Sequence, residues 1–184
     1  MPARPLLARR TLLLAALAAG GAARAGDDDG NVEYQVKAAF VCKFGNYVDW
    51  PANALGAVGE PFRIGVMASA AVLEDFRRTA AAASVAGRPI EVRRLQRGDT
   101  LDGLHALFIS RALSAHAGEL LAAVQGRPVL TMTELDPGGI TGMINFVVVD
   151  DKVRFDIVLP PAVQSGLKIS ARLLAVARRV EGRS

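Results

Sequence analysis

The chain of 184 residues contains little of the chemistry from which disulfides and metal sites are built. Cys42 is its only cysteine, so an intrachain disulfide is excluded and the hydrophobic core must hold the fold unaided. That thiol is either buried and inert, as its apolar neighbours favour, or available for an intermolecular bond. His105 and His116 are the only histidines, and no metal-ligand spacing joins them to Cys42. We therefore expect no metal site.

A long apolar run is also missing. Residues 11–19 are apolar but reach only about half of the ~20 residues that cross a bilayer as a helix. Arg4, Arg9 and Arg10 precede this run, and Ala23 and Ala25 form a small-x-small cleavage site. The pattern predicts a signal peptide over residues 1–25, cleaved after Ala25, and hence an exported protein. The Arg9-Arg10 pair leaves both Sec and twin-arginine export open.

The predicted mature chain has no excess of positive charge. Four of the 22 Lys and Arg residues lie in the signal segment, which leaves 18 basic against 18 acidic residues. A net charge of zero argues against a nucleic-acid partner. About 159 residues remain, which suits one domain. We predict a linker over residues 26–33 and a single domain over residues 34–181.

Hydrophobic periodicity predicts an α/β fold, layered, with a mainly parallel central sheet flanked by helices and a C-terminal antiparallel hairpin. Apolar residues at helical spacing, including Val36, predict an amphipathic helix that Trp50-Pro51 ends. Strands and helices then alternate as far as a Pro/Gly-rich loop. Residues 143–149 and 152–159 form the predicted hairpin, with Lys152, Arg154 and Asp156 on its wet face. A last helix is predicted over residues 169–180, with Ser170 as its cap.

Signatures of catalysis are sparse. Gly138, Gly139 and Gly142 open a strand rather than a helix, so they predict a backbone turn and not a phosphate loop. The candidate nucleophiles, bases and acids are not arranged in a known elbow or triad; they are Cys42, Ser110, Ser114, His105, His116 and Asp102. A structural role is the ordinary expectation for His105, and apolar neighbours should raise the pKa of Cys42. We expect neither an enzyme nor a cofactor.

Binding candidates lie in two places. Lys43, in the aromatic helix, and Arg154, on the wet face of the hairpin, are possible anion contacts. Tyr47 and Trp50 add aromatic surface to the first place, and Asp156 adds a carboxylate to the second. These five residues are the predicted ligand-binding or partner-binding set, although spacing alone does not bring them together.

Seven blocks in order resemble one family. The most distinctive are YQVKAAFVCKFGNYVDWP, GGITGMINFVVVDDKVRFDIVL and SGLKISARLLAVARRV, and between the first two come FRIGVM, GRPIEVRRL, HALFIS and RPVLTMT. Together they run from about residue 34 to residue 180. In this order they resemble the YfiR family of exported bacterial regulators.

The resemblance implies a periplasmic protein that binds the periplasmic sensor domain of a membrane diguanylate cyclase and represses it, which lowers cyclic di-GMP. It also implies a homodimer, a sequestering outer-membrane lipoprotein, a small ligand, and control through cysteine pairs. Cys42 has no second cysteine in this chain, so intrachain redox control does not carry over. Val158 departs from the I-N-L that relatives often have. A receptor for an anionic nucleotide or amino acid near Lys43 and Arg154 is the alternative function, and an enzyme using Cys42 or Ser110 is the third.

Overall fold

The protein was analysed as a computed structural model, which describes residues 25–134 and 141–182 and the side chains from residue 32 onward. Residues 1–24 of the predicted signal segment, and Gly138 and Gly139, therefore lie outside the described residues. The helical elements are α1 (Ala25–Phe44), η1 (Gly45–Tyr47), α2 (Ala70–Ala80), η2 (Arg111–His116), α3 (Ala117–Ala123), α4 (Leu159–Gln164) and α5 (Ala171–Val176). The strands are β1 (Val48–Asp49), β2 (Phe62–Met67), β3 (Ser84–Val85), β4 (Arg88–Arg94), β5 (Ala106–Ile109), β6 (Leu130–Glu134), β7 (Ile144–Val149), β8 (Lys152–Val158), β9 (Lys168–Ile169) and β10 (Arg179–Glu181).

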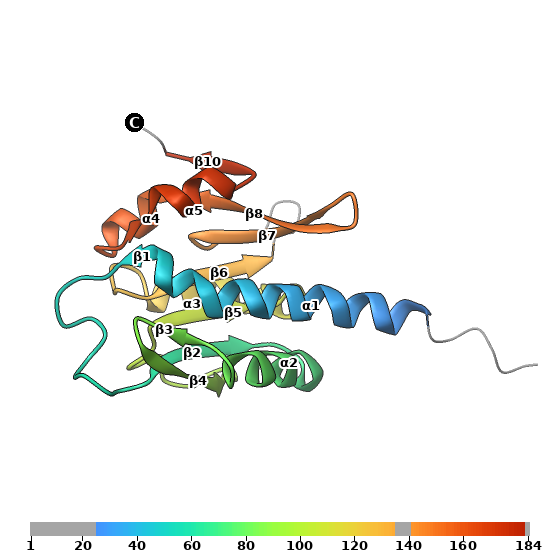
Figure 1. The fold of residues 1–184 in the computed structure, drawn as a ribbon, viewed down its shortest axis with the longest axis horizontal. Coiled ribbons are helices and arrows are strands. Elements are labelled where there is room, and N and C mark those ends of the chain that lie inside the picture. The colour runs from blue at the N-terminus through green and yellow to red at the C-terminus, as the bar shows by residue number, and fades with distance from the viewer. Residues whose placement is uncertain (1–24, 135–140, 183–184) are drawn as a thin grey trace, which may run out of the picture.

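One sheet of eight strands organises the molecule (Figure 1), in the order β10-β8-β7-β6-β5-β2-β4-β3. The pairs β2/β4, β2/β5, β5/β6, β6/β7 and β10/β8 are parallel, while β7/β8 and β3/β4 are antiparallel. The short strands β1 and β9 form a separate antiparallel pair. The predicted fold class, a mainly parallel sheet with an antiparallel hairpin, is confirmed.

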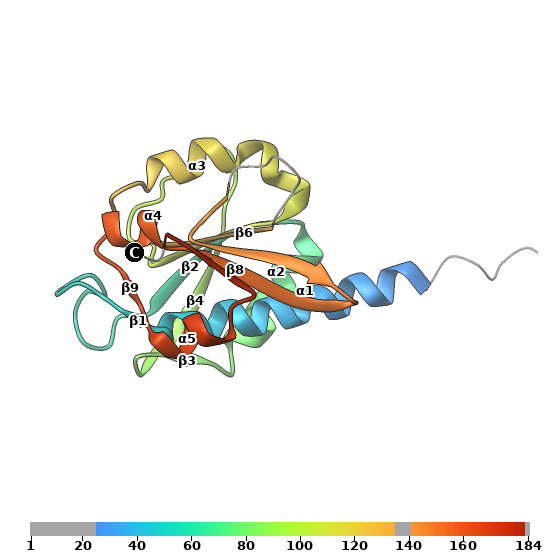
Figure 2. The same ribbon diagram turned by 90° about the horizontal axis from the view of Figure 1, so that it is seen from above.

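Helices cover both faces of the sheet. Figure 2 shows α3 on one face and α1, α2 and α5 on the other. The larger core lies under α1 and α2, where alternate residues of the parallel strands, such as Ile64 and Phe108, meet Val41 and Phe76. The smaller core lies under α3 and contains Leu107 and its neighbours of the same alternation. Strands buried on both faces explain why the central blocks are apolar without a polar alternation.

The β7–β8 hairpin follows the predicted register. Phe146 lies opposite Phe155 and Val149 opposite Lys152, so Asp150 and Asp151 form a two-residue turn. Both aspartates have positive φ, 50° and 56°, as a type I′ turn requires. Twist at such a turn matches the twist of the strands and lets the hairpin extend past the neighbouring β6.

Some element boundaries differ from the predictions. Helix α1 begins at Ala25, so residues 26–33, the predicted linker, are helical. It ends at Phe44 and passes into η1, so the helical segment stops before Trp50. Gly45 packs closely against β3, where an added Cβ would lie 2.7 Å from Val85 Cγ1. The last predicted helix is only α5: Ser170 caps it by accepting from the Leu173 amide, but Ala177 is extended and β10 follows.

Candidate functional site

The N-terminal half of α1 carries an apolar stripe that the core does not cover. Val32, Val36 and Phe40 are four residues apart and therefore share one face of the helix. Val32 is 58% exposed and Val36 38% exposed, whereas Phe40 is half-buried. Phe40 continues the stripe into the core, where its ring lies 5.6 Å from Phe44 and 5.7 Å from Phe155 between centroids. Val36 is thus a surface residue and not the core residue that its spacing predicts.

The tip of the β7–β8 hairpin carries a second set of apolar side chains, which faces the stripe on α1. Val148 and Val153 are partners across β7 and β8, and they share the sheet face on which Phe146 and Phe155 pack against α1. Val148 remains 39% exposed because the hairpin extends beyond the body of the sheet together with α1 (Figure 1). Two projecting elements therefore turn aliphatic side chains toward the same space.

Between them lies a groove of about 710 Å³, hereafter the α1–hairpin groove. It is lined by Val32, Glu33, Val36, Phe40, Val148, Asp151, Lys152, Val153 and Arg154. Its floor is aliphatic and aromatic, and its rim carries two acidic and two basic side chains. Exposed apolar surface rimmed by charge is typical of a protein-binding surface. The large exposed aliphatic residues of the described chain are few, and three of them lie here.

A buried polar cluster fastens α1 beside the groove. Lys37 has no exposed surface, and its ammonium contacts the carboxylates of Glu33 and Glu134. Glu134 ends β6 and also accepts hydrogen bonds from the Tyr34 hydroxyl, at 3.0 Å, and from the Arg111 amide. This cluster ties the helix to the carboxyl ends of β5 and β6.

Burial and the adjacent Glu134 carboxylate both raise the pKa of the Tyr34 phenol, because each disfavours a second negative charge. Tyr34 is therefore a neutral donor at every physiological pH. The Lys37 ammonium lies 4.8 Å from the centre of the Tyr34 ring. These contacts let the cluster hold α1 in place against the sheet.

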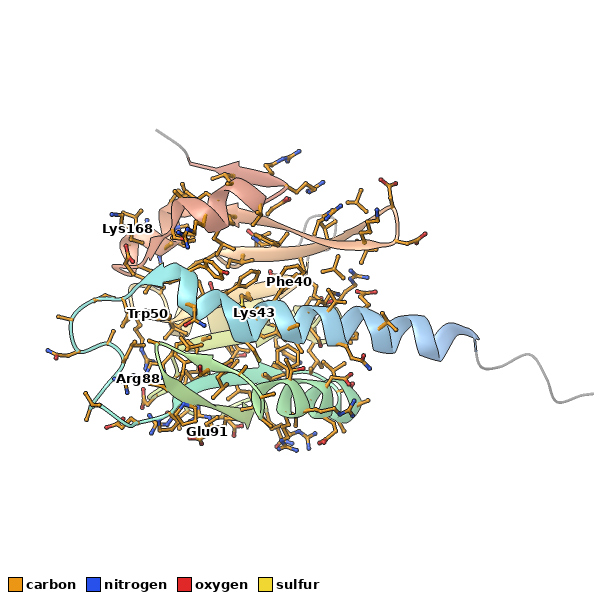
Figure 3. All side chains as sticks on the ribbon, in the orientation of Figure 1. Phe40, Lys43, Trp50, Arg88, Glu91 and Lys168 are labelled. Carbon is orange, nitrogen blue, oxygen red and sulfur yellow. The ribbon has the colours of Figure 1, made fainter. Side chains whose placement is uncertain are left out.

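Of the two predicted anion contacts, only Arg154 lines the groove. Lys43 is exposed in the last turn of α1 (Figure 3) and is absent from the groove lining. The groove therefore brings Arg154 together with Lys152 and not with Lys43.

Tyr47 and Trp50 lie beyond the end of α1. Tyr47 is 38% exposed, and its carbonyl accepts from the Ser170 amide at 2.9 Å. Trp50 is half-buried: its Nε1 donates to the Gly45 carbonyl at 3.0 Å, and its ring packs edge-on against Phe62 with 5.5 Å between centroids. Trp50 thus packs against the hydrophobic core. Neither aromatic residue lines the groove.

The prediction that Asp156 faces solvent is wrong. Asp156 is only 5% exposed, and its carboxylate takes a two-point ion pair from Arg178, with Arg178 Nε at 2.8 Å from Oδ1. Arg178 immediately precedes β10, which pairs in parallel with β8 and covers that edge. Asp156 does alternate with the core-facing residues of β8, as predicted, but the pairing of β10 with β8 and the ion pair with Arg178 bury its side chain.

Cys42 and Ser110, the two candidate nucleophiles of the enzyme hypothesis, are both buried. Cys42 is fully buried, and burial raises the pKa of its thiol to about 12, as its neighbours led us to expect. The Ser110 hydroxyl is buried, and among the described residues it has no hydrogen-bond partner. His105 is structural, as predicted: its Nδ1 accepts from the Arg63 amide at 2.9 Å and its ring stacks on Phe62.

Sequence reasoning missed the groove floor and the Lys37 cluster. The repeat Val32, Val36, Phe40 was a usable signal, but it does not tell which members the sheet covers. Lys37 and Glu134 are 97 positions apart, so only the folded topology pairs them. Within residues 25–134 and 141–182, no group of three or more His, Cys, Asp or Glu side chains is placed to hold a metal ion.

No helix in the described part of the chain is both long and apolar enough to cross a membrane. No curated protein matches the chain. A family model described as YfiR/HmsC-like matches residues 34–178, over three quarters of the chain. The chain belongs to the YfiR/HmsC-like family, a family of periplasmic regulators in cyclic di-GMP signalling rather than of catalysts.

Proposed function

We propose that this member of the YfiR/HmsC-like family is exported, loses its signal peptide after Ala25, and represses an inner-membrane diguanylate cyclase by binding the cyclase's periplasmic sensor domain. The folded unit is a single domain over residues 34–181, preceded by the first turns of α1. Repression lowers cyclic di-GMP and so limits biofilm formation. A homodimer, and an outer-membrane lipoprotein that sequesters the regulator, complete the proposed circuit.

The observation that carries this proposal is the α1–hairpin groove. Aliphatic surface left in water costs free energy that a partner recovers, at about 25 cal/mol for each Å² that becomes buried. The rim charges Glu33, Asp151, Lys152 and Arg154 supply specificity rather than bulk affinity. A repressor must bind two states of its target unequally, and a groove formed by two projecting elements can distinguish shapes of a partner.

Complementation of a deletion strain tests the proposal. Deleting the gene in cells that contain the cognate cyclase should raise cyclic di-GMP, and wild-type protein should lower it again. The double variant Val32→Glu, Val148→Glu places charge on the groove floor, and we expect it to weaken sensor-domain binding about tenfold or more and to fail to complement. Val176→Glu is the matched control, because Val176 is 67% exposed on α5 and does not line the groove.

Each result decides a separate point. Unchanged cyclic di-GMP in the deletion strain would remove the repressor function. Full complementation by the double variant would keep repression but remove the groove as the contact surface.

Arg154→Glu tests the basic rim alone. We expect this variant to associate more slowly with the sensor domain, and high salt to mask the difference. Intact binding by that variant would remove Arg154 from the contact surface.

A further inference from the structure

A second concave site lies on the opposite face of the sheet, under α3. It is a cavity of about 340 Å³ between α3, α4 and the first residues that lead into β7. Figure 2 shows α3 on the far side of the sheet from α1. The residues that matter for its chemistry are Leu121, Val124 and Gln125 from α3, Thr131 and Met143 from the floor, and Gln164 and Ser165 from α4 and its end.

The described residues that line this cavity are uncharged. Neither an acidic nor a basic side chain is among them, although 22% of the chain is charged. Leu121, Val124 and Met143 provide an apolar surface. Gln125, Gln164 and the Ser165 hydroxyl border it, and in the described part of the chain none of these three side-chain groups has a hydrogen-bond partner. Uncommitted amides and a hydroxyl over an apolar floor match the composition of small-molecule sites.

The floor is held rigidly. The Met143 amide donates to Thr131 Oγ1 at 3.0 Å, and the Asn145 side-chain amide donates to the Gly142 carbonyl at 2.8 Å. An added Cβ on Gly142 would lie 2.9 Å from the Thr131 carbonyl oxygen, so only glycine permits this approach of the two segments. A floor fixed in advance reduces the ordering that a ligand must impose.

We propose that this cavity binds a small neutral molecule with a flat apolar body and an amide or hydroxyl group. The apolar body would lie on Met143 and Leu121, and the polar group would exchange hydrogen bonds with Gln164 and Ser165. No cation is among the lining residues that the structure describes, which disfavours carboxylates and phosphates, since these would lose hydration without gaining an ion pair. The volume is at the lower end of the range of about 300–1,000 Å³ for ligand pockets. This site is independent of the repressor function.

Benzamide and benzoate form a matched pair of probes, since they have nearly the same shape and differ in charge. In NMR titrations of the mature protein, we expect benzamide to bind with a Kd of about 1 mM and to shift amides within residues 118–125, 142–143 and 164–165. Benzoate should bind at least about tenfold more weakly. Equal binding of the two probes, or shifts confined to other regions, would overturn the proposal.

Two neighbouring alanines on α3 provide a blocking variant and its control. Ala122 and Ala123 are both exposed, and only Ala122 lines the cavity. Ala122→Phe should abolish the benzamide shifts, whereas Ala123→Phe should retain them, with both variants folded by circular dichroism. Retained binding in Ala122→Phe, or no benzamide shifts in wild-type protein at about 10 mM, would refute the site. If Ala122→Phe fails to fold, Gln164→Leu serves in its place, and an undiminished affinity there counts equally against the proposal.

Discussion

At the scale of single residues, buried polar groups set the strongest constraints. Lys37 is a fully buried cation whose partners are Glu33 and Glu134. Lys37→Met leaves the buried Glu134 carboxylate without its cation, and we expect a loss of about 3–5 kcal/mol in the free energy of unfolding. Lys43→Met, an exposed site on the same helix, should change it by less than about 0.5 kcal/mol. Urea denaturation measures both, and equal effects would mean that the cluster contributes nothing specific.

His105 makes stability depend on pH. Burial, Arg63 and Arg88 lower its pKa below the usual value, while Glu60 opposes them. Its folded state therefore favours the neutral ring, whose Nδ1 accepts from the Arg63 amide. The contribution is complete above the unfolded pKa of about 6.5 and is lost as pH falls from there toward the folded pKa.

One substitution separates the titration of His105 from its role as a hydrogen-bond acceptor. In His105→Asn the side-chain oxygen can take the place of Nδ1 as acceptor without titrating. Between about pH 7.5 and about pH 5, the free energy of unfolding should fall less in this variant than in wild-type protein. Parallel curves for the two proteins would show that His105 does not titrate on unfolding.

At the scale of elements, an ion pair between Arg178 and Asp156 fastens the start of β10 to β8. Arg178 holds the buried Asp156 of β8, and its amide donates to the Phe155 carbonyl at 2.8 Å. Arg178→Gln should cost about 1–3 kcal/mol, since Arg178 itself is partly exposed and solvent weakens the pair. Hydrogen exchange should quicken in β10 and at the facing edge of β8. Arg179→Gln, which removes only a 3.8 Å contact with Glu181, is the control, and it should leave exchange unchanged.

At the scale of the whole molecule, one sheet joins both cores. Because strands β5 and β2 contribute to each core through alternate residues, the two cores should unfold together. Fluorescence of Trp50, the only tryptophan, should therefore follow the same urea transition as far-ultraviolet circular dichroism. Separated midpoints would indicate that the two cores unfold independently.

Features that follow from a local pattern could be predicted from the sequence, whereas features that depend on contacts between distant residues could not. The alternation of Val153, Phe155 and Ile157 was sufficient for the hairpin, because strand faces follow from a period of two. The burial of Asp156 was not predictable in this way, since it depends on Arg178, 22 positions away, and on a strand pairing that spacing does not encode. Likewise, the exposure of Val36 depends on how far α1 projects past the sheet. Of the five candidate site residues, only Arg154 reaches the groove.

The projection of α1 also determines at which terminus the protein should be tagged for binding experiments. The start of α1 and the end of β10 lie at opposite ends of the molecule in Figure 1. Val32 is seven residues beyond Ala25, a helical rise of about 10 Å, so a bulky tag fused there would sit within reach of the groove. Immobilising the mature protein through its C-terminus instead leaves that end of the helix in solution. If the proposed function holds, affinities for the sensor domain measured with the two attachments should differ, because only the N-terminal tag obstructs the groove.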